Sequence, residues 1–123
     1  MFDDVIRRLE VLGLDNARTM PDLIRFSIEK VTETVKNKCN TPAIPLGMRF
    51  AAVDMVCGEV LFLLKGTGKL TGFDVEGAVK QLQEGDTNIT YAIPDAVITV
   101  DGFIDMLRRA GESQYAAFRR FKW

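Results

Sequence analysis

The sequence predicts a mainly α-helical protein: a small bundle of about four helices, with one β-hairpin between the central helix and the C-terminal helix. Two observations support this fold class. Apolar residues recur at spacings of three and four over most of the chain, and prolines and glycines separate these stretches. By contrast, the residues from Ile89 to Ile93 alternate apolar and polar, as a half-buried strand does. The length of 123 residues suits a single domain, residues 1–123.

The first two helices are predicted from amphipathic stripes and their stop signals. The first runs from Phe2 to Leu12, with two aspartates near its positive end and Gly13 as its stop. The second begins at Pro21 and ends before Pro42, because proline restricts the residue that precedes it. Its apolar stripe consists of Ile24, Ile28, Val31, Val35 and Cys39.

The third helix starts near Pro45 and is predicted to be central and most buried. Asp54, Gly58 and Lys65 share a narrow stripe, while apolar side chains fill most of the remaining circumference. A membrane span would need about 20 apolar residues in succession, and charged residues interrupt this run. We therefore expect a core helix and no membrane contact.

A hairpin is predicted after the third helix. The glycine-rich stretch Lys65 to Gly72 is expected to be a mobile connection. The strand Ile89 to Ile93 is then expected to pair with Val79 to Gln83 across a turn at Glu84 to Thr87. A helical turn over Val75 to Gln83 is the alternative for the first arm.

The last helix is predicted after Pro94. Asp101 is its expected N-cap, and Gly111 is expected to kink or divide it. Its apolar face consists of Phe103, Leu107, Ala110, Ala117 and Phe121.

The C-terminal quarter is basic and aromatic. Its cations either complement the negative end of a helix dipole or contact nucleic-acid phosphates. We expect Tyr115 and Phe118 to pack on the core, and Phe121 and Trp123 to contact a partner, since exposed aromatic side chains are unfavourable. The cations are Arg108, Arg109, Arg119, Arg120 and Lys122.

The composition removes the common routes to catalysis. The chain has no histidine, which is the usual general base and metal ligand, and its net charge of -1 gives no overall attraction to nucleic acid. The fragment "GTGK" departs from a phosphate loop, which needs a glycine where Leu63 stands and a serine or threonine where Leu70 stands. Asp54 and Glu59 are about 140° apart around a helix and do not converge.

Cysteine usage and the turn carboxylates also favour structural roles. Cys39 and Cys57 fall in different predicted helices without a Cys-x-x-Cys pair, so we expect two buried free thiols. Glu84 and Asp86 are expected to have a structural role in the turn, where an aspartate commonly bonds neighbouring backbone groups. We therefore expect no catalytic residue, no metal site and no cofactor.

The order of these pieces resembles the head-tail connector family of tailed bacteriophages and prophages, also called adaptor or head-completion proteins, which dock under the portal. The resemblance covers nearly the whole chain. It rests on "VKNKCNTPAIP" closing the second helix, "LGMRFAAVDMV" in the third, then "EGDTNITYAI", and "AAFRRFKW" at the end. The chain departs from the family pattern in the glycine-rich "GTGKLTG" and at Gly111.

The resemblance implies a non-enzymatic protein of the virion neck, made in the bacterial host cytoplasm. Such proteins form a ring below the portal that extends the DNA channel and joins head to tail. The implied partners are the portal protein, neighbouring copies, the next neck or tail-completion protein, and DNA that passes without specific binding. The implied portal or subunit interface consists of Glu84, Gly85, Asp86, Thr87, Asn88, Tyr91, Phe118, Arg119, Arg120, Phe121, Lys122 and Trp123.

Two other functional classes stay open. A small helical DNA-binding or regulatory protein would use the basic C-terminal helix, with Arg108, Arg109, Arg119 and Arg120 on phosphates. An enzyme ranks third, because no set of side chains converges in the predicted arrangement.

Overall fold

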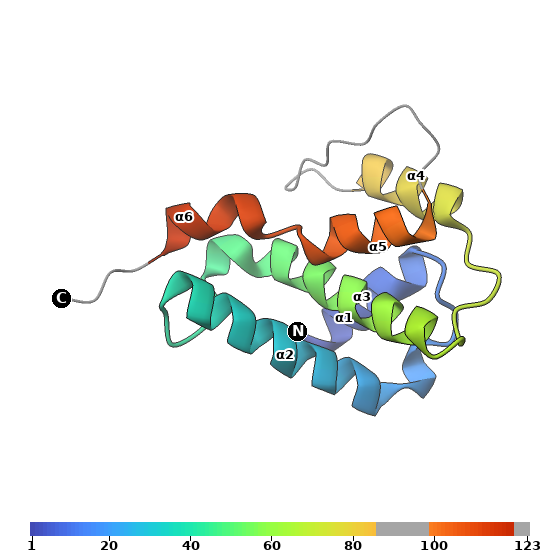
Figure 1. Cartoon of the computed structure of the whole chain (residues 1–123), viewed down its shortest axis with the longest axis horizontal. Helices are drawn as coiled ribbons and strands as arrows, with labels where there is room; N and C mark the ends of the chain where they lie inside the picture. The colour runs from blue at the N-terminus through green and yellow to red at the C-terminus, as the bar shows by residue number, and fades with distance from the viewer. Residues whose placement is uncertain (86–98, 120–123) are drawn as a thin grey trace.

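The computed structural model describes residues 1–85 and 99–119, with side chains described for these ranges except residues 82–85. This part of the chain is mainly helical and contains no strand (Figure 1), which confirms the predicted fold class in its coarse form. The helices are α1 (Phe2–Val11), α2 (Pro21–Cys39), α3 (Arg49–Gly66), α4 (Val75–Gly85), α5 (Val100–Arg108) and α6 (Tyr115–Phe118). Short 3₁₀ turns are η1 (Ala17–Thr19), η2 (Leu46–Met48) and η3 (Glu112–Gln114).

Helix α3 is the centre of the fold. Helices α1, α2 and α5 pack around it, and every residue from Ala51 to Leu61 is buried. The partner helices contribute fully buried apolar side chains, among them Leu9, Ile24 and Phe103. The prediction of a central, most buried third helix is confirmed. Among the described residues, no helix combines the length and the apolar character that crossing a bilayer requires.

Glycines with positive φ end two of the helices. Gly13 has a φ of 104°, and the N–H of Leu14 donates to the carbonyl of Leu9 at 2.9 Å. Gly68 has a φ of 73°, and the N–H of the next residue donates to the carbonyl of Leu64 at 2.8 Å. Both are Schellman motifs, which satisfy carbonyls at a helix end. The stop at Gly13 is confirmed, and the first half of the glycine-rich stretch serves as a helix cap.

Helix α4 corrects the predicted first arm of the hairpin. Val79–Gln83 was predicted as a strand but lies within α4, as do Glu84 and Gly85, which were predicted in the turn. Helix formation has a local cause: Val75, Ala78, Val79 and Leu82 follow the helical spacing i, i+3, i+4, i+7.

The start of α4 is capped. The Oδ1 atom of Asp74 accepts a hydrogen bond from the N–H of Gly77 at 3.1 Å, as an N-cap aspartate does. Gly77 leaves room for this contact, because a Cβ at that position would lie 2.4 Å from Asp74 Oδ2. The predicted strand Ile89–Ile93 lies outside the described residues.

The last predicted helix is divided at Gly111, as expected. Gly111 is buried, and a Cβ there would lie 2.8 Å from the sulfur of Met55. The N-cap of α5 is Thr99, whose hydroxyl accepts from the N–H of Gly102 at 3.0 Å. Asp101, predicted as the cap, instead lies in the first turn of α5 and forms an ion pair with Lys65.

Candidate functional site

The C-terminal segment leaves the domain from an anchored position. Helix α6 packs against α2, and the half-buried ring of Phe118 lies over Gly47. A Cβ at Gly47 would come within 2.2 Å of Phe118 Cζ, so any residue other than glycine at this position would clash with the ring. Tyr115 is also half-buried, and its hydroxyl donates to the sulfur of Met55 at 3.8 Å. The expectation that Tyr115 and Phe118 pack on the core is confirmed.

The structure describes only some of the residues predicted to form the interface. Phe118 lies against η2, Arg119 is exposed, and Glu84 and Gly85 are the last two residues of α4. Phe118 ends α6 and Arg119 follows it, whereas Glu84 and Gly85 end a different helix, α4. Outside the described residues lie Asp86, Thr87, Asn88, Tyr91, Arg120, Phe121, Lys122 and Trp123.

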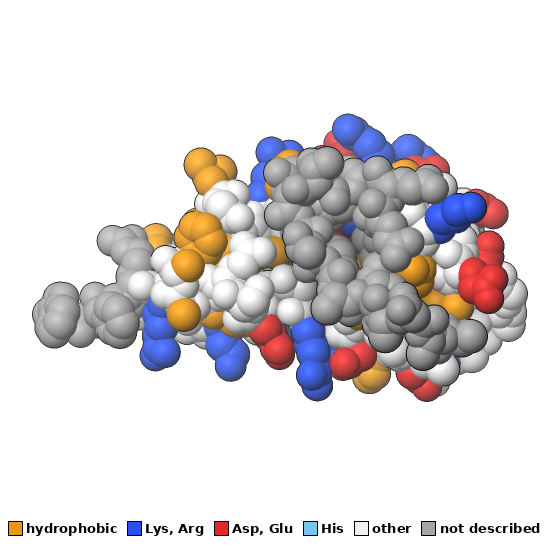
Figure 2. All heavy atoms as spheres, turned by 90° about the horizontal axis from the view of Figure 1, so that it is seen from above, with side chains coloured by type: hydrophobic (Ala, Val, Ile, Leu, Met, Phe, Trp, Pro, Cys, Tyr) orange, Lys and Arg blue, Asp and Glu red, His pale blue; other side chains and the backbone are white. Residues whose placement is uncertain are grey.

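Two strongly exposed apolar side chains lie at the turn into α3. Leu46 in η2 is 89% exposed and Phe50 in the first turn of α3 is 55% exposed. Figure 2 shows hydrophobic side chains on the surface at the end of the molecule where α6 lies. The guanidinium of Arg49 lies 5.9 Å from the centroid of the Phe50 ring and also pairs with Asp4 at 3.1 Å. We call Leu46 and Phe50 the apical turn.

Sequence reasoning missed the apical turn. It placed these two residues inside a buried helix, where apolar side chains need no further explanation. Pro45 could have indicated this exposure. A proline directly before a helix marks the turn by which the chain enters it, and the side chains of such a turn need not face the core. The 3₁₀ turn η2 follows Pro45 and turns Leu46 outward.

A second apolar surface lies at the opposite end of α2 and α3. A groove of about 490 Å³ lies there between the start of α2 and the end of α3. Phe26 beside it is 56% exposed, and Asp22 and Lys69 are its charged lining residues. The remaining lining residues are Thr19, Met20, Pro21, Leu23, Leu63, Leu64 and Thr67. We call this surface the end groove.

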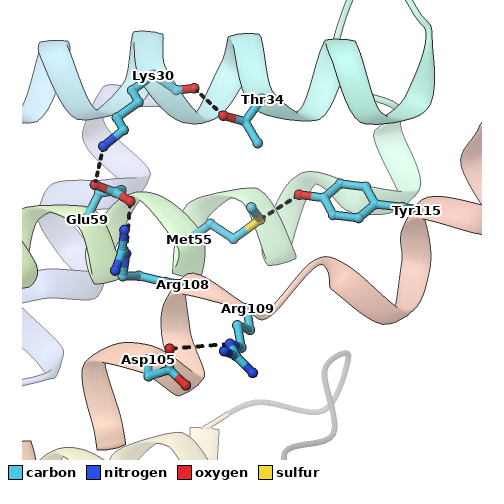
Figure 3. Close-up of polar contacts among 8 residues, drawn as sticks. All are labelled: Lys30, Thr34, Met55, Glu59, Asp105, Arg108, Arg109 and Tyr115. Carbon is cyan, nitrogen blue, oxygen red and sulfur yellow. Dashed lines mark hydrogen bonds and ion pairs between the residues drawn. The ribbon is translucent and has the colours of Figure 1, made fainter. Parts of the chain in front are cut away.

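The buried carboxylate of Glu59 joins three helices (Figure 3). Glu59 of α3 accepts from Lys30 of α2 at 3.2 Å and from Arg108 of α5 at 2.9 Å. A groove of about 290 Å³, lined also by Thr34 and Glu112, runs beside these groups. Because its two cationic partners come from different helices, the carboxylate of Glu59 ties α2 and α5 to α3.

The other buried carboxylate, Asp54, is held from a different side. Its two oxygens accept from the Nε and Nη2 atoms of Arg8 in α1, at 2.8 and 3.3 Å. Asp54 and Glu59 thus contact different helices, which confirms that they do not converge. Among the described residues, no group of three or more cysteine, aspartate or glutamate side chains is arranged to hold a metal ion.

The basic residues of the DNA-binding alternative are partly engaged within the molecule. The side chain of Arg108 is 33% exposed, bonds Glu59 and stacks 4.0 Å from the centroid of the Phe62 ring. Arg109 pairs with Asp105 at 3.3 Å (Figure 3). The contacts of Arg108 reduce the charge that it offers to a phosphate, whereas Arg109, with 64% of its side chain exposed, and Arg119 are both accessible.

Both cysteines are free and buried, as expected. Burial raises the pKa of the Cys57 thiol well above its ordinary value, and the nearby charge of Asp54 raises it further. Burial also raises the pKa of Cys39, whose sulfur lies 3.5 Å from that of Met48. Neither thiol is suited to act as a nucleophile, because the thiolate is the reactive form.

Comparison of the chain with protein-family models, with curated proteins and with solved structures found no match.

Proposed function

We propose that the protein is a structural adaptor in the neck of a tailed phage or prophage. It forms a ring under the portal, extends the DNA channel and joins head to tail. The observation that carries this proposal is the anchored C-terminal segment: Phe118 is fixed over Gly47, and the aromatic and basic residues Arg119 to Trp123 follow directly. The ordered resemblance to the connector family adds to it.

The anchor supports a docking role because it reduces the cost of binding. A segment whose base is held in place loses less conformational freedom when it meets a partner. Phe121 and Trp123 would supply the apolar contact area, since aromatic residues are enriched at interface centres. Arg119, Arg120 and Lys122 would supply charge complementarity to the portal.

The segment after α4 is the second proposed contact. Together with Glu84 and Gly85, which end α4, it supplies Asp86 to Asn88 and Tyr91. We retain the alternating stretch Ile89–Ile93 as a predicted strand, with a pairing partner other than Val79–Gln83, since those residues are helical. A strand of this kind would suit pairing with a neighbouring subunit by strand addition.

The test of this function is the location of the protein and the requirement for it. Electron microscopy of particles carrying a tagged copy should place it in the neck, and its deletion should leave heads without joined tails. A position elsewhere, or tailed and infectious particles without it, would overturn the proposal.

A pair of variants separates portal docking from DNA binding. Replacing Phe121 and Trp123 with serine keeps every cation, whereas replacing Arg119, Arg120 and Lys122 with glutamine keeps both aromatic residues. If the protein is an adaptor, the variant that lacks Phe121 and Trp123 should lose portal binding. Loss of salt-dependent duplex DNA binding in the glutamine variant, with portal binding absent throughout, would favour the DNA-binding reading instead.

A further inference from the structure

We propose that helix α6 exchanges between copies of the protein, so that Tyr115 and Phe118 of one subunit occupy the α6 seat of the next. The α6 seat is the surface formed by Gly47 and Met55, on which α6 lies within a single chain. The exchange supplies the self-contact that a ring requires, and it rests on the proposed function in that respect only. It is testable without a portal, because it involves one kind of chain.

The structure shows what covers the α6 seat: the two rings of the chain's own α6, at the end of the molecule where α2 leads into α3 (Figure 1). The ring of Phe118 takes the place that a Cβ at Gly47 would need, and the hydroxyl of Tyr115 donates to the sulfur of Met55 at 3.8 Å. Every copy carries the same rings and the same seat, so these contacts can form between two copies as they do within one. Exchange of an identical element is a low-cost route to association for this reason.

Few contacts hold α6 on its seat. Tyr115 and Phe118 are half-buried, whereas Ala116 and Ala117 of the same helix are exposed. The contact of the hydroxyl with Met55 is weak, because a thioether sulfur is a poor acceptor. Elements with few buried contacts open at a lower free-energy cost than the core, so α6 can leave its seat while α3 and the helices around it stay folded.

The connection between α5 and α6 is suited to act as a hinge. The N–H of Glu112 donates to the carbonyl of Arg109, and that of Gln114 to the carbonyl of Gly111, each at 3.0 Å. Gly111 and Gln114 lie in the right-handed helical region, and changes of about 30–40° in φ and ψ would make them α-helical. A residue turns by about 120° in a 3₁₀-helix and by about 100° in an α-helix. Continuing α5 through this connection therefore rotates the rings of α6 off their own seat.

Local concentration decides between a chain's own seat and that of a neighbour. A short connection holds α6 near its own seat at an effective concentration of about 1 mM, and adjacent subunits of a ring present their seats at a comparable concentration. Dilute protein is therefore expected to keep α6 on its own seat. In both arrangements Phe118 lies over a Gly47, so Arg119 to Trp123 start from the same kind of anchor.

Two variants separate the rings from the seat. Gly47→Ala blocks the seat and keeps both rings, whereas Phe118→Ser keeps the seat and removes its main occupant. The measurement is an NMR titration in which isotope-labelled Phe118→Ser is observed while an unlabelled chain is added. Unlabelled Gly47→Ala should shift the amide signals of Gly47 and Met55, with half-saturation below about 1 mM. Unlabelled Phe118→Ser is the matched control and should shift neither signal.

Two further samples assign the contact to α6. A Gly47→Ala chain that ends at Phe118 should shift the same signals as strongly as the full-length variant. Wild type should contain species larger than a monomer at about 1 mM, measured by translational diffusion, whereas Gly47→Ala alone should stay monomeric because all its seats are blocked.

Three results would overturn the exchange: no shift with Gly47→Ala up to about 1 mM, equal shifts with the Phe118→Ser control, or a wild type that stays monomeric at about 1 mM. Shifts that vanish when the titrant ends at Phe118 would also overturn it, because they would assign the contact to Arg119 to Trp123. Exchange without portal binding would overturn the adaptor function and leave this inference intact, and portal binding without exchange would do the reverse.

Discussion

The ring of Phe118 lies against the backbone of Gly47, so closely that a Cβ at Gly47 would lie 2.2 Å from Cζ and 2.6 Å from Cε1 of the ring. These residues are far apart in sequence, and their contact fixes the short helix α6 on the turn between α2 and α3. The absence of a side chain at Gly47 thus determines where the C-terminal segment leaves the domain.

Replacing Gly47 with alanine should release α6 while the rest of the fold persists. The atoms that would clash belong to the far end of a ring on a four-residue helix, which can move away. We expect a stability loss of about 1–2 kcal/mol, together with faster hydrogen exchange of the α6 amides. Gly66→Ala is the control: nothing lies within 4 Å of its added Cβ, and alanine favours the helix. Unchanged exchange in α6 would contradict the anchoring role of Gly47.

Replacing Gly58 with alanine should cost more. A Cβ there would lie 2.8 Å from both the backbone nitrogen and the Cγ atom of Arg108, and 3.0 Å from Leu107 Cβ. Because backbone is among the clashing atoms, α5 as a whole must move away from α3. We expect a loss of about 2–3 kcal/mol in urea unfolding, against no loss for Gly66→Ala. A Gly58→Ala protein as stable as the control would mean that α3 and α5 are farther apart than described.

The helices that the sequence predicts well have one buried stripe and a local stop signal. In α2, Ile24, Val31, Val35 and Cys39 of the predicted stripe are buried, and Asn40 ends the helix with a φ of 53°. Such helices are predictable because burial and capping depend on residues close in sequence.

The errors arose where tertiary contacts choose between local alternatives. Asp101 and Thr99 are both good N-cap residues, and Lys65, which is distant in sequence, pairs with Asp101 while Thr99 caps the helix. The apolar residues Leu46 and Phe50 fit a core helix equally well by spacing. Their exposure depends on how η2 enters α3, which a hydrophobic pattern does not encode.

Replacing Asp74 with alanine should loosen α4 selectively. It removes the oxygen that accepts from the N–H of Gly77, and loss of an N-cap costs about 0.5–2 kcal/mol. We expect faster hydrogen exchange over α4, with α1 to α3 unchanged, and recovery of protection in Asp74→Ser, whose hydroxyl can cap. Equal exchange in the alanine and serine variants would indicate that Asp74 does not cap a helix here.

The two buried thiols should make the native protein less stable as the pH rises above about 8.5. An unfolded thiol titrates near pH 8.5, and burial raises the pKa of Cys39 and, more strongly, that of Cys57 above this ordinary value. Above that pH the unfolded chain releases thiol protons that the folded chain keeps. Stability present below about pH 8.5 is therefore lost as the pH rises, by up to about 1.4 kcal/mol per pH unit for each thiol.

The measurement is the free energy of urea unfolding between pH 7 and pH 10 for wild type and Cys57→Ala. The alanine variant is expected to be less stable at pH 7, because it leaves a small cavity beside Val5, but its stability should fall less steeply with pH. Because lysines titrate equally in both proteins, the difference between the two slopes isolates the thiol. Parallel slopes would contradict the raised pKa of Cys57. Rapid labelling of the native protein by a thiol reagent at pH 8 would contradict it as well, since a buried, protonated thiol reacts only when the chain opens.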